Sequence, residues 1–237
     1  MMKNIVFEDE HILVAYKPAG IATQTKRVGQ QDMVSEIKNY LNKTSAGKGG
    51  KKEPYVGLIH RLDQPVCGLL VFGKTPEAAS FLSEEVREGT LEKYYYAIVY
   101  GRPEKENGEL KDYLYKDPKS NMSLIVKEGF PDSKEARLEY QCIKTLFALE
   151  DNVEASLLEI KLITGRHHQI RAQLSNAGMP ILGDTKYGSI ESKEFSRESS
   201  CRNIALCAHR LSFIHPVTKK ELTFLRNSED DIFKAFL

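Results

Sequence analysis

The chain has 237 residues, of which 41% are hydrophobic and 28% are charged, and its formal net charge is +1. This composition supports a hydrophobic core in one large domain or two small ones, and it excludes a chain that is disordered throughout. The pI near 7.7 also excludes a protein that binds nucleic acid by a large overall positive charge, so any basic surface must be local.

The cysteine and hydropathy patterns indicate the cellular setting. The four cysteines show no C-x-x-C pair and no zinc-ligand spacing, which predicts reduced thiols and no metal ion. No apolar run approaches the roughly 18 residues that a membrane-spanning helix needs, and the first residues lack a signal-peptide pattern. We therefore expect a soluble, cytoplasmic protein that does not contact a membrane.

The N-terminal part of the chain predicts a hairpin, a helix and a loop. Residues 5–20, IVFEDEHILVAYKPAG, predict two short strands around an Asp-Glu turn, followed by a second turn. The lysine-rich segment 42–54 has two interpretations, a solvated flexible loop or a mobile basic loop that contacts a phosphate backbone. Between them, residues 31–41 place apolar side chains on one helical face, namely Met33, Val34, Ile37 and Leu41.

The stretch 68–75, GLLVFGKT, matches the phosphate-loop pattern of two glycines followed by Lys-Thr. A phosphate loop needs small, flexible residues between its glycines, so that backbone N–H groups can surround the phosphates. Here the intervening residues 69–72 are Leu, Leu, Val and Phe, which favour a buried strand. We therefore predict a strand instead of a triphosphate site. The next segment, 75–88, predicts a helix that Thr75 caps and Gly89 ends.

The turn that leads into this strand carries a candidate catalytic group. Four of residues 60–67, HRLDQPVC, are polar (His60, Arg61, Asp63 and Gln64), and Pro65 stiffens the segment. An aspartate held in such a turn beside a buried strand is a candidate nucleophile or general acid/base, and this describes Asp63. The alternative is an ordinary turn aspartate, because Asp is common in turns.

A second candidate lies in the strand predicted by EKYYYAIVYG, residues 92–101. Alternation along a strand places Lys93, Tyr95, Ala97 and Val99 on one face, and Tyr94, Tyr96, Ile98 and Tyr100 on the other. Most of these tyrosines are expected to pack in the core or across strands. Tyr95 is the candidate for acid/base work, because the neighbouring cation of Lys93 favours its phenolate.

The rest of the chain is rich in predicted strands. Residues 102–152 contain a turn-rich part and then alternating strands, and 153–163 predict another strand. A helix is predicted over 167–176, a loop over 189–203 and a closing hairpin over 205–225. Strands outnumber helices and many follow each other without a crossover helix. We therefore predict an α+β fold with a mixed, largely antiparallel sheet and flanking helices.

The helix of segment TGRHHQIRAQL predicts a buried arginine. If the helix starts near His167, one face carries His167, Ile170, Arg171 and Leu174. A buried guanidinium needs a carboxylate partner, and Asp63 is the expected one, although an arginine that extends to solvent is the alternative.

The same segment predicts a phosphate contact and argues against a metal site. Residues 164–166 would form the helix N-terminus, where free N–H groups favour a phosphate. On a helix, His167 and His168 point about 100° apart, which is unsuitable for binding one metal ion.

Several motifs in order resemble the RluA-type pseudouridine synthases over nearly the whole chain. HRLDQPVCGLL is similar to the family's H-R-L-D-x-x-x-x-G-L-L signature, and KPAG to its K-P-x-G turn. LEKYYYAIVYG resembles its K-x-Y-x-A strand. ITGRHHQIRAQLSNAGMPILGDTKYG is similar to T-G-R-x-H-Q-I-R followed by G-x-P-I-x-G-D-x-x-Y-G, and LCAHRLSFIHPVTKKELTF resembles the C-terminal segment.

The resemblance implies isomerisation of uridine to pseudouridine in ribosomal or transfer RNA, with no cofactor and no metal. It also implies a single catalytic domain over residues 1–237, with a central RNA-binding cleft and without the N-terminal S4-type RNA-binding domain of many relatives. We expect a monomer.

The resemblance also implies roles for individual residues. Asp63 would be the catalytic aspartate, Tyr95 would stack on the uracil and act as the base, and Arg171 would pair with Asp63 and keep it ionised. Arg61 would help to fill the space left when the target nucleotide flips out. Contacts with the RNA are implied for His60, Arg61, Lys74, Lys93, Arg166 and His168. Val66-Cys67 stand where the family often has Thr-Ser, and His167 where Thr is frequent, so the fit to the substrate stays open.

Two other functions compete with this one. A non-catalytic RNA-binding or RNA-folding protein could use the same scaffold, but it would not need Asp63, Tyr95 and Arg171 together. A hydrolase that uses Asp63 is weaker, because no second carboxylate stands out to complete an acid/base pair.

Overall fold

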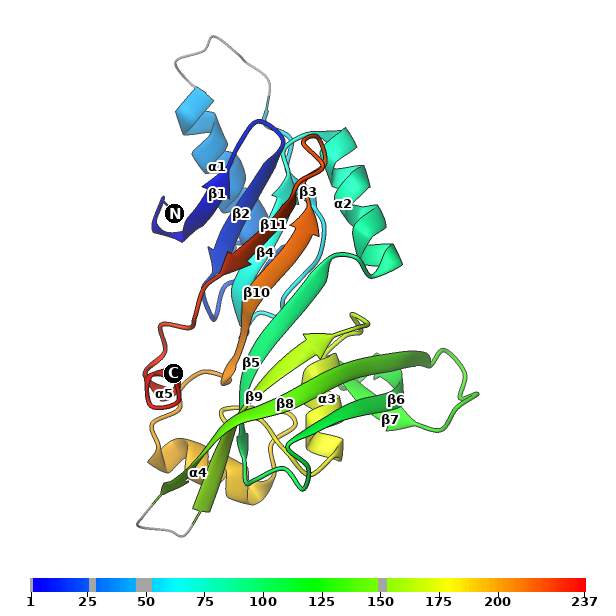
Figure 1. Cartoon of the computed structure of the whole chain (residues 1–237), viewed down its shortest axis with the longest axis vertical. Coiled ribbons are helices and arrows are strands. Elements are labelled where there is room, and N and C mark those ends of the chain that lie inside the picture. Colours follow the sequence, from blue (N-terminus) through cyan, green and yellow to red (C-terminus); the bar gives the residue numbers. More distant parts are fainter. Residues whose placement is uncertain (1, 26–28, 46–52, 149–152) are drawn as a thin grey trace. The chain divides into compact units, whose positions relative to one another are not determined.

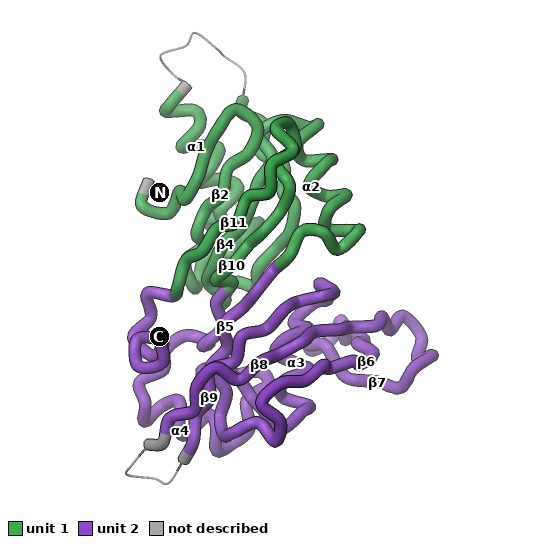
Figure 2. The backbone as a smooth tube through the Cα atoms, viewed as in Figure 1, with its two compact units in different colours: residues 1–92, 208–227 green, residues 93–207, 228–237 purple. Residues whose placement is uncertain are grey.

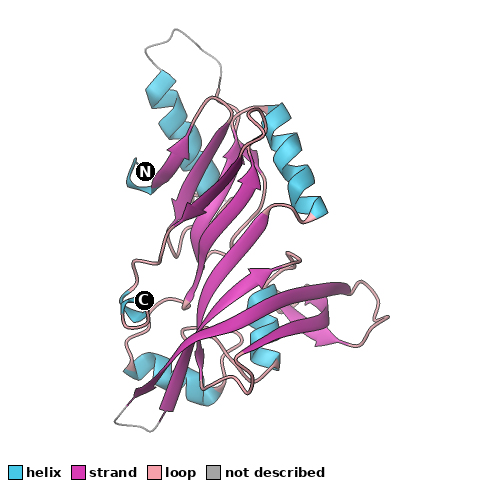
Figure 3. Ribbon diagram, in the orientation of Figure 1, coloured by secondary structure: helices cyan, strands magenta, loops and turns pink. Residues whose placement is uncertain are grey.

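A computed structural model describes residues 2–25, 29–45, 53–148 and 153–237 (Figure 1). Strands outnumber helices in this part of the chain, and the ladders β1/β2, β2/β4, β5/β9, β8/β9, β6/β8, β6/β7 and β10/β11 are all antiparallel (Figure 3). The predicted α+β fold with a mixed, largely antiparallel sheet is confirmed.

The chain divides into two compact units (Figure 2). Both units are discontinuous in sequence, because the chain leaves unit 1 at Glu92 and returns to it at Ala208. Unit 1 comprises residues 1–92 and 208–227, and unit 2 comprises residues 93–207 and 228–237. The expectation of a single domain over residues 1–237 stays a prediction.

In its described residues, unit 1 has a sheet with two α-helices. Its strands follow the order β1-β2-β4-β10, with β11 paired to β10 and β3 to β4. The strands are β1 (Ile5–Glu8), β2 (Ile12–Lys17), β3 (Gly57–Leu58), β4 (Cys67–Gly73), β10 (Leu206–Ile214) and β11 (Glu221–Leu225). A 3-10 helix, η1 (Met2–Asn4), precedes β1, and the α-helices are α1 (Met33–Ser45) and α2 (Pro76–Glu88).

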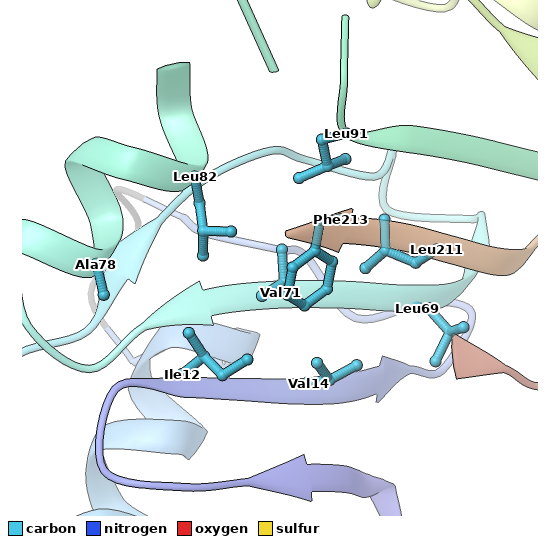
Figure 4. Close-up of a cluster of buried hydrophobic side chains, with 9 residues drawn as sticks. All are labelled: Ile12, Val14, Leu69, Val71, Ala78, Leu82, Leu91, Leu211 and Phe213. Carbon is cyan, nitrogen blue, oxygen red and sulfur yellow. The ribbon is translucent and has the colours of Figure 1, made fainter. Parts of the chain in front are cut away.

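The core of unit 1 forms around β2 and β4. Every residue of these two strands is buried, because both carry continuous apolar runs that can be covered on two faces. Figure 4 shows α2 placing Ala78 and Leu82 on the cluster that these strands form with β10. The cluster comprises Ile12, Val14, Leu69, Val71, Ala78, Leu82, Leu91, Leu211 and Phe213. The prediction that GLLVFGKT forms a buried strand is therefore confirmed.

Both helices of unit 1 follow their sequence signals. The four predicted apolar positions of α1 are buried, but α1 continues to Ser45, so the first residues of segment 42–54 are helical. Residues 46–52 of that predicted basic loop lie outside the described residues. In α2, Thr75 Oγ1 accepts a hydrogen bond from the N–H of Ala78, and Gly89 ends the helix with φ 79°.

Gly68 allows β4 and β10 to approach closely. Its φ is +130°, and a Cβ at this position would lie 2.4 Å from the backbone N and O atoms of Ala208. Gly68 is also a paired residue of the ladder, opposite Lys17 of β2. The glycine is therefore required by its backbone angle and by contact with the neighbouring strand.

Unit 2 has a five-strand path, β5-β9-β8-β6-β7. On this sheet, Ala172 of a helix packs against Leu114 and Ala136. None of the helices in the described parts of the chain is long and apolar enough to cross a membrane. The strands are β5 (Glu92–Tyr100), β6 (Asn107–Asp117), β7 (Met122–Val126), β8 (Lys134–Ala148) and β9 (Val153–Leu162), and the helices are α3 (Gln169–Asn176), α4 (Ile190–Glu198) and α5 (Asp231–Lys234).

The predicted loop over 189–203 is wrong, because residues 190–198 form α4. Ser189 caps the helix by accepting a hydrogen bond from the N–H of Ser192. The buried face of α4 carries Ser192 and Ser196, and Ser196 Oγ accepts from the N–H of Gly183 at 2.9 Å. Hydrophobic periodicity could not indicate this helix, because its buried face is small and polar.

The predicted C-terminal hairpin is confirmed. Strands β10 and β11 pair antiparallel, with Ile214 opposite Glu221. The turn between them is stabilised by His215, whose Nδ1 accepts a hydrogen bond from the N–H of Thr218 at 2.9 Å. Hydrogen bonds from a side chain to nearby backbone groups are typical of such turns.

Candidate active site

Asp63 lies in unit 1, in a turn whose backbone is held on both sides. Its carbonyl oxygen accepts a hydrogen bond from the N–H of Val66 at 3.0 Å. The preceding residue, Leu62, is buried. Its N–H donates to Thr23 Oγ1 at 3.1 Å, and its carbonyl accepts from the same hydroxyl at 2.8 Å. The half-buried carboxylate of Asp63 therefore projects from a segment with little conformational freedom.

Lys17 connects the KPAG turn to the residue that follows Asp63. This lysine is fully buried, and its Nζ donates to the carbonyl oxygens of Pro18 (3.0 Å), Ile21 (2.7 Å) and Gln64 (3.0 Å). The Gln64 carbonyl also accepts from the N–H of Gly20 at 2.9 Å. The donors of one ammonium group thus hold two separate loops together.

The electrostatic environment of Lys17 includes the candidate carboxylate. Burial lowers the pKa of Lys17 to about 8, while the charges of Cys67 and Asp63 act to raise it. Below that pH the ammonium form predominates and forms a fixed positive charge near Asp63. Sequence reasoning gave Lys17 no role, although a lysine that ends the apolar strand ILVAYK, directly before a proline, was the available signal.

The other candidate residues of unit 1 differ in their contacts. His60 Nε2 accepts a hydrogen bond from the N–H of Val71 at 3.4 Å, which joins the turn to β4. Arg61 is exposed. Lys74 forms a half-buried ion pair with Glu8 at 2.6 Å and donates to the carbonyl of Asp9. An RNA phosphate would therefore have to compete with Glu8 for Lys74.

In unit 2, β5 places Lys93 and Tyr95 on its buried face, as alternation predicted. Their exposed fractions are 9% and 5%, while Tyr94 and Tyr96 on the other face are half-buried. Burial lowers the pKa of Lys93. Its Nζ lies 3.9 Å from the position that a Cβ on Gly165 would occupy. The strand that carries Tyr95 thus adjoins the T-G-R loop.

Arg171 is buried, as predicted, and its carboxylate partner within unit 2 is Asp184. Nε of Arg171 donates to Oδ2 at 2.7 Å and Nη2 donates to Oδ1 at 2.8 Å. The guanidinium carbon lies 5.1 Å from the centre of the Tyr187 ring. Sequence reasoning missed Asp184, although it is the aspartate of the GDTKYG motif. The pairing of Arg171 with Asp63 joins residues of different units and stays a prediction.

Asp184 is held in its ionised form. Burial would raise the pKa of this carboxyl group, but the ion pair with Arg171 lowers it, and so do hydrogen bonds from the backbone N–H groups of Tyr187 and Lys186. These N–H groups lie 3.1 and 2.9 Å from Oδ1. The net effect is a pKa below the ordinary value, so Arg171 has a negatively charged partner at neutral pH.

The predicted start of the helix at His167 is wrong, because α3 begins at Gln169. The Gln169 side chain folds back on the preceding loop, where its Oε1 accepts from Thr164 Oγ1 at 2.8 Å and from the N–H of Arg166 at 3.0 Å. Residues 164–166 therefore precede the helix and do not form its N-terminus. The Arg166 N–H, expected to face a phosphate, already has a partner.

The two adjacent histidines are also arranged differently from the expectation. Their rings stack at 3.7 Å between centres, with 25° between their planes. His168 adopts a left-handed backbone conformation, with φ 50°, and lies outside the helix, so the 100° spacing of helical neighbours does not apply. Nδ1 of His167 lies 3.1 Å from Ser123 Oγ, and Nδ1 of His168 lies 2.9 Å from the hydroxyl of Tyr187.

Comparison with known sequences shows which family shares these motifs. Residues 11–176 match the family model described as RNA pseudouridylate synthase. A protein of Zymomonas mobilis named "Ribosomal large subunit pseudouridine synthase D" is 34% identical over 98% of this chain and 71% of its own length. The "Dual-specificity RNA pseudouridine synthase RluA" of Vibrio parahaemolyticus is 33% identical over 90% of this chain and 78% of its own length.

Solved structures share the fold. Human RNA Pseudouridylate Synthase Domain Containing 4 superimposes with a TM-score of 0.74 at 23% identity, covering 98% of this chain and 91% of that chain. Human RNA Pseudouridylate Synthase Domain Containing 1 superimposes with a TM-score of 0.68 at 19% identity, covering 98% of this chain and 93% of that chain. At these identities the likeness shows the fold alone.

Proposed function

Because this chain belongs to the RluA-type family of RNA pseudouridine synthases, we propose that it isomerises specific uridines of ribosomal or transfer RNA, with Asp63 as its catalytic residue. The family makes it an isomerase that acts on RNA. Ribosomal RNA as substrate is supported by relatives that are named for the large ribosomal subunit. The corresponding location is the cytoplasm, where ribosomes and transfer RNA are found.

The reaction exchanges one bond of the uracil ring for another. The bond between N1 and C1′ breaks, the ring turns, C5 bonds to C1′, the proton on C5 leaves and N1 gains a proton. No electrons are gained or lost, so acid/base and nucleophilic side chains suffice. In this proposal the Asp63 carboxylate assists the cleavage of the glycosidic bond or adds to the ribose or uracil, and Tyr95 removes the C5 proton.

The remaining residues would hold the substrate. Flipping a nucleotide out of an RNA helix costs a few kcal/mol, and an exposed side chain such as Arg61 can fill the space it leaves. Lys93, Arg166 and His168 belong to the loop and strand next to Tyr95 in unit 2, and we assign them to contacts with the RNA. We assign the same role to His60, which precedes Asp63, and to Lys74, which follows β4 at the end of the strand opposite the Asp63 turn.

The observation that carries the proposal is the combination of the family match with a fixed Asp63 turn. The buried side chains of Thr23 and Lys17 hold the backbone before and after Asp63 through hydrogen bonds. A turn aspartate without a catalytic role does not require a fully buried lysine beside it, because burying a charge is costly. This supports the catalytic role over the ordinary turn residue.

The test uses RNA labelled with tritium at uridine C5, taken from a strain that lacks the gene. Wild-type protein should release tritium to water, and Asp63→Asn should not, while its thermal unfolding curve matches that of wild type. Release that persists in Asp63→Asn would refute the role of Asp63. RNA binding by a wild-type protein that releases no tritium would favour the non-catalytic RNA-binding function.

A further inference from the structure

Tyr187 contacts both Arg171 and His168, which belong to the predicted site. Its ring lies under the Arg171 guanidinium at 5.1 Å. Its hydroxyl lies 2.9 Å from Nδ1 of His168 and accepts a hydrogen bond from the N–H of Ser123 at 2.6 Å. A cation over an aromatic face and a hydrogen bond at the ring's edge are separate interactions, so one side chain acts on two neighbours.

The backbone of Tyr187 is itself fixed within unit 2. Its N–H donates to Oδ1 of Asp184 at 3.1 Å, and its carbonyl accepts from Ser175 Oγ of α3 at 2.6 Å. Asp184 follows a short segment that is bonded to β5, since the N–H of Leu182 donates to the carbonyl of Ile98 at 2.9 Å. Through Asp184 and Leu182, these hydrogen bonds connect Tyr187 to β5, the strand that carries Tyr95.

His168 adopts a backbone conformation that depends on its surroundings. Its φ of 50° and ψ of 24° lie in the left-handed region, which is unfavourable for a residue with a side chain. Such conformations persist where neighbouring contacts fix them, and they are concentrated at functional sites. His168 makes no side-chain cap bond to α3. Its ring is held instead by the stack on His167 and by the Tyr187 hydroxyl.

We propose that Tyr187 is a positioning residue of the isomerisation, whose ring orients Arg171 and whose hydroxyl orients His168. The inference rests on the proposed function. The hydroxyl accepts from the Ser123 N–H, and we assign its own proton to Nδ1 of His168. In this tautomer the ring proton is on Nε2, which makes His168 a hydrogen-bond donor toward an RNA oxygen.

Two substitutions separate the two contacts of this side chain. Tyr187→Phe keeps the ring under Arg171 and removes the hydroxyl, so the apparent KM for C5-tritiated RNA should rise about threefold to tenfold while kcat stays within about twofold. Tyr187→Leu removes the ring as well, so kcat should also fall about tenfold or more. Tyr113→Phe is the matched control, because it removes a hydroxyl that bonds to Glu128 at 2.6 Å on the exposed side of β6.

The outcomes distinguish this inference from the function on which it rests. If wild type releases no tritium, the proposed function fails. If wild type is active and both Tyr187 variants share its kcat and KM, the positioning role is overturned. It is overturned equally if Tyr187→Phe lowers kcat with an unchanged KM. A parallel loss of kcat and thermal stability in both variants, with KM unchanged, would show a structural role only.

Discussion

Arg171 and Asp184 form a buried ion pair with two hydrogen bonds, in which the side chains are only 5% and 0% exposed. The carboxylate binds the edge of the guanidinium formed by Nε and Nη2. A guanidinium is a planar fork with donors on both edges, so this pairing fixes the plane of Arg171 and directs its other edge away from Asp184.

The first prediction concerns the loss of this partner. Asp184→Asn keeps the shape of the side chain but leaves Arg171 as a buried charge without a counter-ion, which should lower the free energy of unfolding by about 3–5 kcal/mol. Chemical denaturation measures the change. Glu53→Gln, which removes the exposed ion pair with Lys38, is the control and should leave the denaturation curve unchanged.

The second prediction concerns the stability of the folded protein at acidic pH. The pKa of Asp184 is below its ordinary value of 3.8 in the folded protein, so its contribution to stability is present above that value and is lost as pH falls through the folded pKa. Wild type should therefore lose more stability than Asp184→Asn when the pH falls below about 4. Denaturation curves at a series of pH values measure this, and a constant difference between the two proteins would contradict it.

The third prediction concerns the contribution of Lys17 to the stability of the folded protein at alkaline pH. The folded pKa is about 8 and the ordinary value is 10.5, so between these values the unfolded chain binds a proton that the folded chain does not. The free energy of unfolding should therefore rise with pH between these two values, by up to about 1.4 kcal/mol per pH unit. Wild type should gain stability relative to Lys17→Met from about pH 8 to 10. The measurement is chemical denaturation at a series of pH values. If the free energies of unfolding of the two proteins change with pH in parallel, Lys17 keeps an ordinary pKa.

The fourth prediction compares two glycines with positive φ. Gly68→Ala would place a methyl group 2.4 Å from backbone atoms of Ala208, whereas at Gly89 nothing lies within 4 Å. Gly89→Ala should cost about 1 kcal/mol from the backbone conformation alone. Gly68→Ala should cost at least about 3 kcal/mol, because β4 and β10 must move apart. Thermal unfolding of the two variants measures the difference, and equal costs would show that the strands separate without penalty.

Local patterns were sufficient to predict the elements whose side chains specify them. The buried strand β4 follows from a continuous apolar run, and α2 follows from its cap at Thr75, its apolar face and Gly89. The face of α1 was predicted for the same reason. In each case the residues that fix the structure are adjacent in the sequence.

The features that sequence reasoning missed depend on distant contacts. Helix α4 buries serines, whose partners include the backbone of Gly183. The left-handed conformation of His168 is associated with contacts from Tyr187, which lies 19 residues away in sequence. Asp184 and Lys17 were present in recognised motifs, but only the folded chain shows that Asp184 fixes Arg171 and that Lys17 joins the Asp63 turn to the KPAG turn. Such roles leave no periodic pattern of hydrophobic residues in the sequence.

The division of the chain into units has a consequence for its synthesis. The core cluster of unit 1 draws Ile12 and Leu69 from the first segment and Leu211 and Phe213 from the segment that returns after unit 2. A ribosome that has released the first 92 residues has therefore supplied only part of this core. Because domains generally fold as units during translation, β2 and β4 must wait for β10 while the strands of unit 2 emerge. Until β10 is synthesised, the cluster that β2, β4 and α2 begin lacks Leu211 and Phe213.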